Sequence, residues 1–155
     1  MKHALSEIEL TKISDSDLRI GIVHSSYYKE EVGKMISSAK DALVDSGIKE
    51  SNITEYPVVG AFEIPLIGSA LADAKKVDAL IGFGVVVQGE TQHAQAIVAE
   101  AARGMMDVQT QKGIPFAFEI LHVDSLDQAR ERVEVKGREA AVAVLSSLNV
   151  INAVM

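Results

Sequence analysis

The sequence predicts an α/β fold of three layers, in which helices cover both faces of a four-stranded parallel sheet. Segments with strand patterns alternate along the chain with segments of helical periodicity, an order typical of parallel sheets built from right-handed crossovers. Aliphatic side chains must fill the core, because 48% of the residues are hydrophobic and only 5% are aromatic. The length of 155 residues fits one domain.

The first half of the chain supplies two strands and two helices. We expect a strand at residues 18–23 and, after it, a helix that ends at Gly47. A second strand is expected at residues 53–58, and Gly60 marks the entry to the next helix. Apolar residues at helical spacing define these helices: Val32, Met35, Ile36, Ala39 and Leu43 in the first, and Ile64, Leu66, Ile67 and Leu71 in the second.

The third strand has the clearest pattern. Residues 79–87 form a continuous apolar run, which is typical of a central strand covered on both faces. The turn at residues 88–91 is expected to open a long helix that closes at Gly113. The apolar stripe of this helix consists of Ile97, Val98, Ala101, Met105 and Val108.

The last third of the chain supplies a fourth strand and two helices. The strand is expected at residues 114–121, and Asp124 or Ser125 can cap the helix that follows. Gly137 is expected to separate this helix from a last amphipathic helix. The apolar positions of the last helix are Ala141, Val144, Leu145 and Leu148.

Residues 1–17 are expected to form a tail outside a single domain at residues 18–155. The tail contains no proline, so it could add a strand to the sheet edge of a neighbouring subunit. A net charge of −7 disfavours nucleic acid as a partner, and the absence of cysteine excludes disulfides and thiolate nucleophiles. No apolar segment has the length of a membrane span, and we expect a cytoplasmic protein.

Three segments lie just after the first three predicted strands: HSSYY at residues 24–28, VVGAFE at 58–63 and QGETQH at 88–93. The carboxyl ends of parallel strands meet at one edge of the sheet, where ligands of α/β folds bind. In the third segment Glu90 and Thr91 stand at the start of a helix, whose unpaired N–H groups suit an anion such as phosphate. The same residues also fit an ordinary capping turn.

His93 is the first candidate for proton transfer. A position in the first turn of a helix favours a neutral imidazole, which can accept a proton. A lone helix histidine is more often a surface or packing residue, so His93 is not decided by position alone. His24 and His122, at the ends of two strands, compete with it, whereas His3 lies in the tail.

Other candidates have both a binding and a structural interpretation. Tyr27 could stack on a planar heterocycle or cover the sheet edge, and the same holds for Tyr28. Glu63 could accept hydrogen bonds from sugar-like hydroxyls, although the helix dipole favours an acid there in any case. The residues Arg130, Arg132, Lys136 and Arg138 could bind phosphate or form a solvated face.

Five motifs in order resemble the 6,7-dimethyl-8-ribityllumazine synthase family. They are GAFEIP at residues 60–65, GVVVQGETQH at 84–93, EAARG at 100–104, IPFAF at 114–118, and LDQARER followed by KG. The match keeps its register from Ile20 to Leu148. The resemblance implies a flavodoxin-like fold and the condensation of 5-amino-6-ribitylaminouracil with 3,4-dihydroxy-2-butanone 4-phosphate. It implies no metal or redox cofactor.

The resemblance also implies roles for individual residues. It assigns proton transfer to His93 and phosphate binding to Arg132 and to the turn of Glu90 and Thr91. Phe118 would come from the adjacent subunit of a homopentamer, in which sites lie between neighbours; an icosahedral shell of pentamers and a complex with riboflavin synthase are further candidates. The other implied substrate contacts are Tyr27 and Lys136 at the pyrimidine, Glu63 with Ala61 and Phe62 at the ribityl chain, and Val85, Val86 and Val87 at the end of the third strand.

The sequence departs from the family pattern at several positions. Val59 replaces a proline, and Gln88 replaces an arginine that is common before the GET turn. Small residues are usual at Glu119, and the segment between Arg132 and Lys136 is shorter than in many bacterial relatives. The remaining departures are Ala94, Gln95 and Ala96 after the histidine, and His122, Val123 and Asp124 in place of a Thr-rich turn.

Three rival functions remain at this point. The chain could be a non-catalytic shell protein that binds flavin or lumazine, and product formation would separate the two. It could be a flavodoxin-like signalling domain, but a receiver needs clustered acids at strand ends and the segment LRIGIVHSS offers none. The archaeal riboflavin synthase related to this family is disfavoured by the intact GETQH turn.

Overall fold

The computed structural model describes residues 9–13 and 17–155, and its sheet has four parallel strands in the order β2-β1-β3-β4. The strands are β1 (Ile20–Ser25), β2 (Ile53–Val58), β3 (Ala79–Val87) and β4 (Phe116–Val123). The helices are α2 (Lys29–Asp45), α3 (Ile64–Asp73), α4 (His93–Lys112), α5 (Leu126–Arg130) and α6 (Val133–Val154), with short 3-10 turns η1 (Glu50–Asn52) and η2 (Ala61–Glu63).

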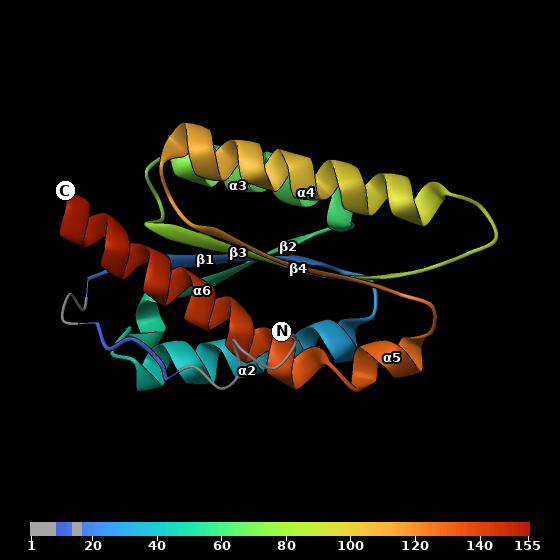
Figure 1. Cartoon of the computed structure of the whole chain (residues 1–155), viewed down its shortest axis with the longest axis horizontal. Helices are drawn as coiled ribbons and strands as arrows, with labels where there is room; N and C mark the ends of the chain where they lie inside the picture. Colours follow the sequence, from blue (N-terminus) through green and yellow to red (C-terminus); the bar gives the residue numbers. More distant parts are fainter. Residues whose placement is uncertain (1–8, 14–16) are drawn as a thin grey trace.

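The sheet lies between two helical layers (Figure 1). Helices α3 and α4 cover one face, while α2 and α6 cover the other together with the short α5. Neighbouring residues of one strand point to opposite layers. Ile22 and Phe83 pack toward α2 and α6, whereas Val23 and Leu80 pack toward α3 and α4. This arrangement confirms the predicted three-layer fold with a flavodoxin-like strand order.

Two strands lie two residues further along the chain than the sequence pattern predicts. Strand β1 continues through His24 and Ser25 because β2 pairs with them as far as Val58. Strand β4 begins after Pro115, and it continues to Val123 because β3 pairs with it to the end. Polar residues therefore belong to the ends of both strands, where an apolar pattern does not reveal them.

The turn after β3 is longer than predicted, and α4 begins only at His93. Residues 88–92 are not helical. At the other end the prediction is confirmed: Gly113 adopts the left-handed conformation with φ 70, and its N–H donates to the carbonyl of Gln109.

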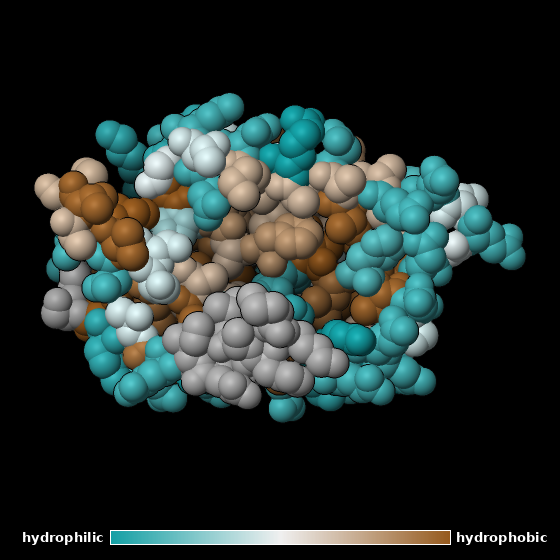
Figure 2. All heavy atoms as spheres, viewed as in Figure 1, coloured by the Kyte–Doolittle hydropathy of each residue, from teal (hydrophilic) through white to brown (hydrophobic). Residues whose placement is uncertain are grey.

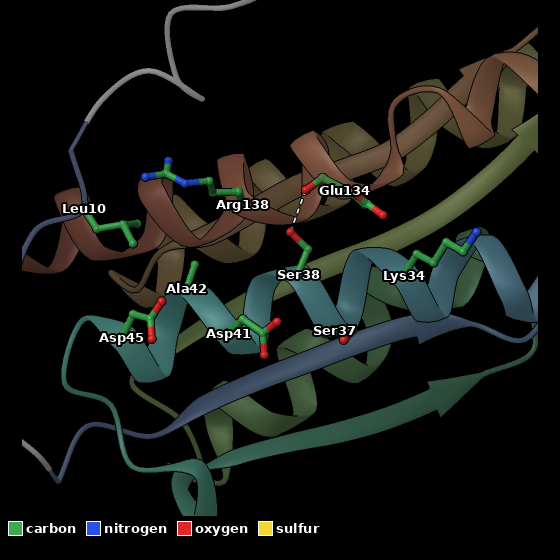
Figure 3. A pocket seen from close by; sticks show the side chains of 9 residues that line it. All are labelled: Leu10, Lys34, Ser37, Ser38, Asp41, Ala42, Asp45, Glu134 and Arg138. Atoms are coloured by element: carbon green, nitrogen blue, oxygen red, sulfur yellow. Dashed lines mark hydrogen bonds between the residues drawn. The ribbon is translucent and has the colours of Figure 1, made fainter.

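Gly137 does not separate two helices, contrary to the prediction. It lies inside α6, and the break comes earlier, at Glu131 and Arg132. A β-carbon at position 137 would clash with the carbonyl oxygen of Met35 on α2. The glycine thus allows α2 and α6 to approach closely, and Ser38 Oγ donates a hydrogen bond of 2.6 Å to the carbonyl of Glu134 across this contact (Figure 3).

The described part of the predicted tail contacts its own chain. Leu10 and Ile13 pack against the core on the α2 side, and the Ile13 N–H donates to the carbonyl of Ser46 at 2.8 Å. Residues 1–8 and 14–16 lie outside the described residues, so an intersubunit strand and the boundary at residue 17 stay predictions. Within the described ranges, no helix is long and apolar enough to span a membrane.

Candidate functional site

A pocket of about 650 Å³ opens at the carboxyl ends of β1, β2 and β3. The chain crosses from one side of β1 to the other at this point, since β2 and β3 flank it. Open α/β sheets bind their ligands at such a switch point. We call this cavity the strand-end pocket; its described lining is Ser25, Tyr27, Tyr28, Val59, Gly60, Ala61, Phe62, Glu63, Val85, Val86, Val87, His93, Ala96, Ile97 and Glu100.

Hydrogen bonds join the loops after β1 and β2 next to the pocket. Ser26 donates from its backbone N–H to the carbonyl of Val59 at 3.2 Å and from Oγ to the carbonyl of Val58 at 2.6 Å. The N–H of Tyr27 donates to Ser25 Oγ at 3.1 Å. Tyr28 then starts α2 with a left-handed backbone, φ 53, which is uncommon for a residue with a large side chain. These bonds fix the wall that carries both tyrosines.

The aromatic wall of the pocket is open to solvent. Tyr27 is 60% exposed and Phe62 is 57% exposed. The ring of Tyr27 lies beside Gly60, where a β-carbon would be 3.4 Å from its Cε2 atom. A ring that is held along one edge and exposed elsewhere can stack on a planar ligand.

Glu63 has a structural contact and still borders the pocket. One carboxylate oxygen, Oε1, accepts the N–H of Gly60 at 2.9 Å and so closes the η2 turn. The first helical residues of α3 follow directly. Glu63 therefore has a structural role at the start of this turn, and it also belongs to the lining of the pocket.

His93 and the end of β3 form the opposite wall. Val85, Val86 and Val87 line the pocket, and His93 begins α4 with its side chain at the same cavity. The N–H of His93, the first residue of α4, donates to Thr91 Oγ1 at 3.3 Å. Glu90 and Thr91 themselves are exposed and belong to the turn before the helix.

The competing histidines do not line the pocket. His24 is directed to Glu55 on β2, with 3.9 Å between Nε2 and Oε1, and its Nδ1 lies 3.2 Å from the carbonyl oxygen of Ser25. His122 contacts Gln88. His3 lies outside the described residues. Of the described histidines, His93 is the one positioned to serve the cavity.

The described lining of the pocket contains carboxylates but no lysine or arginine. Glu63 and Glu100 supply the acids. A hydrogen bond from Arg103, 2.8 Å long, lowers the pKa of Glu100, which keeps that carboxylate charged at neutral pH. One chain therefore offers hydrogen bonding, stacking and a proton acceptor here, while the cation that a phosphate needs is absent from this lining.

The other predicted site residues lie outside the pocket. Phe118 is 40% exposed on the edge strand β4. Arg132 stands at the start of α6, and its Nη1 donates to the carbonyl of Gln128 at 2.8 Å. Figure 2 shows hydrophobic surface between the layers of α4 and α6, with hydrophilic residues around it.

Lys136 belongs to a partly buried group of charges on α6 and β4. Its Nζ lies 3.1 Å from Oε2 of Glu139, which is 3% exposed. Glu119 on β4 is close to this pair. Burial raises the pKa of Glu119 to about 7; the positive charge of Lys136 opposes the rise and the negative charge of Glu139 adds to it. Two carboxylates thus share one lysine.

Some pocket residues escaped the sequence interpretation, although a signal existed. Ala96, Ile97 and Glu100 follow His93 by three, four and seven positions, the spacing of one helix face. The helix face that starts at His93 therefore predicts that these three residues line the pocket. No cluster of three or more potential metal ligands occurs among the residues that the structure describes.

Sequence comparisons place this chain among known proteins. A sequence model of the 6,7-dimethyl-8-ribityllumazine synthase family matches residues 17–152. The chain is also 40% identical over 139 residues to a protein of Methylobacillus flagellatus named 6,7-dimethyl-8-ribityllumazine synthase. That alignment covers 90% of this chain and 93% of the relative.

Proposed function

Because this chain belongs to the 6,7-dimethyl-8-ribityllumazine synthase family, we propose that the strand-end pocket is where its two substrates meet. The protein is a transferase of riboflavin biosynthesis that condenses 5-amino-6-ribitylaminouracil with 3,4-dihydroxy-2-butanone 4-phosphate to 6,7-dimethyl-8-ribityllumazine. One observation carries the assignment of the pocket: Tyr27, Glu63, Val86 and His93, which come from separate parts of the sequence, surround one cavity.

In this proposal the uracil substrate lies along the aromatic wall. Tyr27 stacks on the pyrimidine, and the ribityl chain runs past Phe62 toward Glu63. The exposed ring of Tyr27 and the polar η2 turn support this orientation. The ends of Val85, Val86 and Val87 form the floor against which the reacting atoms are held.

The butanone phosphate lies next to the turn of Glu90 and Thr91. The amine of the ribitylaminouracil attacks the butanone carbonyl to form an imine, and water leaves. His93 then accepts a proton and phosphate leaves by elimination, after which the ring closes with loss of a second water. Holding both substrates side by side supplies much of the rate, and the histidine adds on the order of a hundredfold or more.

The site is completed by a neighbouring subunit. A phosphate requires a cation, and the described lining of the pocket has none. Arg132, with Lys136 and Phe118, lies outside the pocket of its own chain, so these residues reach a site from the adjacent subunit. The exposed Phe118 on an edge strand supports a subunit contact there.

A homopentamer is the assembly that we propose, with an icosahedral shell as the larger alternative. Light scattering on the full chain separates these states, and a monomer at micromolar concentration would contradict the shared site. A complex with riboflavin synthase and a cytoplasmic location stay predictions.

Mixing two impaired variants tests the shared site, with activity measured at a butanone phosphate concentration that does not saturate Arg132→Ala. His93→Ala and Arg132→Ala chains carry their lesions in different halves of it, so a co-expressed hybrid contains some sites with both residues intact. We expect the hybrid to be more active than either parent. If His93 and Arg132 of one chain served the same site, every site in the hybrid would keep a lesion and no such gain would appear.

A further inference from the structure

The turn between β3 and α4 is joined to the end of β4 by a single side chain. Gln88 Nε2 donates to the carbonyls of Gly89 and Thr91, both at 3.0 Å. Its Oε1 lies 2.7 Å from Nε2 of His122 on β4. The backbone N–H of Gln88 donates to the carbonyl of Val123 at 2.8 Å. One glutamine thus spans the turn and connects it to the sheet.

These contacts define the donors and acceptors. The amide nitrogen of Gln88 donates to two carbonyls, so its oxygen is free to accept. His122 must then carry a proton on Nε2 and donate it to Oε1. The bond exists in the neutral Nε2–H tautomer and in the charged imidazolium alike.

We propose that Gln88 and His122 form a positioning pair that holds the turn of Glu90 and Thr91 in the shape that binds phosphate. The inference rests on the proposed function, because it presumes that this turn binds the phosphate. Residues 88–92 have no helix or strand to define them, and the side-chain bonds of Gln88 close the turn from Gly89 to Thr91.

The pair also reaches the start of α4. Thr91 Oγ1 accepts the N–H of His93, so a turn held at the Thr91 carbonyl keeps this hydrogen bond in place. Positioning of a binding group in advance lowers the cost of ordering it when the ligand arrives. The expected consequence is a lower Michaelis constant for the phosphate substrate, with little change in the chemical step.

The pair links the turn to β4 through an uncharged side chain. In this chain the two side chains contact each other. A neutral glutamine shapes the turn but adds no charge, which leaves the charge of the phosphate to a cation from outside the pocket.

Steady-state kinetics of the assembled full-length protein with both substrates tests the pair. Gln88→Ala and His122→Ala should each raise the Michaelis constant for the butanone phosphate about three- to tenfold, the size expected for losing one or two hydrogen bonds. The inhibition constant of inorganic phosphate should rise in parallel. The turnover number and the Michaelis constant for the ribitylaminouracil should change less than about twofold.

The double variant and a conservative variant give the decisive comparisons. Because the two residues share one bond, Gln88→Ala with His122→Ala should cost less than the product of the single effects. His122→Gln should raise the Michaelis constant for the butanone phosphate much less than His122→Ala does. The Nε2 of glutamine is also a donor, and it reaches nearly as far as that of histidine. Gln111→Ala, at the far end of α4, serves as the matched control and should change nothing.

Several results would overturn the pair. Independent, multiplicative effects of the two substitutions would contradict a shared bond, and a His122→Gln variant no better than alanine would contradict the donor role. Thr91→Ala distinguishes a failure of the proposed phosphate site from a failure of the positioning pair. If Thr91→Ala leaves the affinity for phosphate unchanged, the turn does not bind the phosphate and the pair has no phosphate site to position. If Thr91→Ala weakens phosphate binding but Gln88→Ala and His122→Ala do not, only the proposed positioning pair is refuted.

Discussion

The predicted site residues fall into two regions that one chain places apart. Tyr27, Glu63 and His93 line the strand-end pocket. Arg132 and Lys136 lie at the start of α6, outside it. The pocket carries stacking and hydrogen-bonding groups and two carboxylates, whereas the second region carries the cations.

In the proposed function, therefore, neither region binds both substrates by itself. The pocket suits a neutral, planar uracil with a hydroxylated chain, and the basic region suits a phosphate. If neighbouring subunits bring the regions together, activity depends on association as well as on folding. The following substitutions are ordered from the largest expected effect to the smallest.

His93→Ala should remove the proposed proton transfer from the strand-end pocket. Turnover should fall by about a hundredfold or more, because the proposed role is proton transfer in the elimination. Binding of a product analogue should stay within a few-fold, as measured by titration. His24→Ala removes an imidazole outside the pocket and serves as the control. An unchanged turnover number in His93→Ala would remove the residue from the mechanism.

Arg132→Ala should weaken the binding of the butanone phosphate and leave that of the ribitylaminouracil almost unchanged. The Michaelis constant for the butanone phosphate should rise about ten- to a hundredfold, the size of a lost charged hydrogen bond, while that for the ribitylaminouracil changes little. Arg132→Lys should recover only part, because lysine lacks the planar fork. Inorganic phosphate should inhibit the alanine variant poorly.

Arg19→Ala is the control for the loss of a guanidinium, since Arg19 pairs with Asp78 before β1 begins. Equal increases of both Michaelis constants in Arg132→Ala would make Arg132 a structural residue. The anion site should then be sought at Lys136 or Arg138.

Tyr27→Ala should weaken binding of the pyrimidine part by about 1–3 kcal/mol, in line with stacking on other aromatic platforms. Tyr27→Phe keeps the ring and should bind as the unmutated protein does. Calorimetric titration with a ribityllumazine analogue measures both. Equal affinity for all three proteins would place the ring outside the binding mode.

Glu119→Gln should have the smallest effect, on stability rather than on catalysis. The raised pKa means that the folded protein holds this proton between pH 4.5, the ordinary value, and about 7. The stability that Glu119 contributes is complete below pH 4.5 and is lost as the pH rises through about 7. Glutamine mimics the protonated acid and should remove this dependence.

The expected difference in unfolding free energy between pH 5 and pH 8 is about 1–2 kcal/mol. Denaturant unfolding at one fixed protein concentration measures it, because association also contributes to stability. Glu50→Gln, a change in an exposed 3-10 turn, is the control. If the unfolding free energies of Glu119→Gln and of the unmutated protein changed with pH in the same way, Glu119 would not be the source of the pH dependence.

The sequence predicted the layers and the strand-helix order well, since a buried parallel strand such as β3 must be apolar along its length. It misplaced the helix break at Gly137. A glycine in a helical pattern indicates either an end or a close approach of another backbone, and only the packing of α6 on Met35 and Ser38 decides between them.

The pocket was predictable to the extent that it follows from topology. Residues after parallel strands share an edge, so Tyr27, Glu63 and His93 could be grouped from their positions alone. The contact of Gln88 with His122, and the burial of Glu119 beside Lys136 and Glu139, could not. Both depend on how β4 is placed against its neighbours, which local patterns do not encode.

Helix α6 begins near the carboxyl ends of the strands and carries the chain back across the molecule (Figure 1). Its 22 residues cover about 33 Å at 1.5 Å per residue. The chain then ends at Met155, which is 97% exposed. A fluorophore, purification tag or passenger peptide joined there is held roughly that distance from the start of α6, at the opposite end of the subunit from the strand-end pocket.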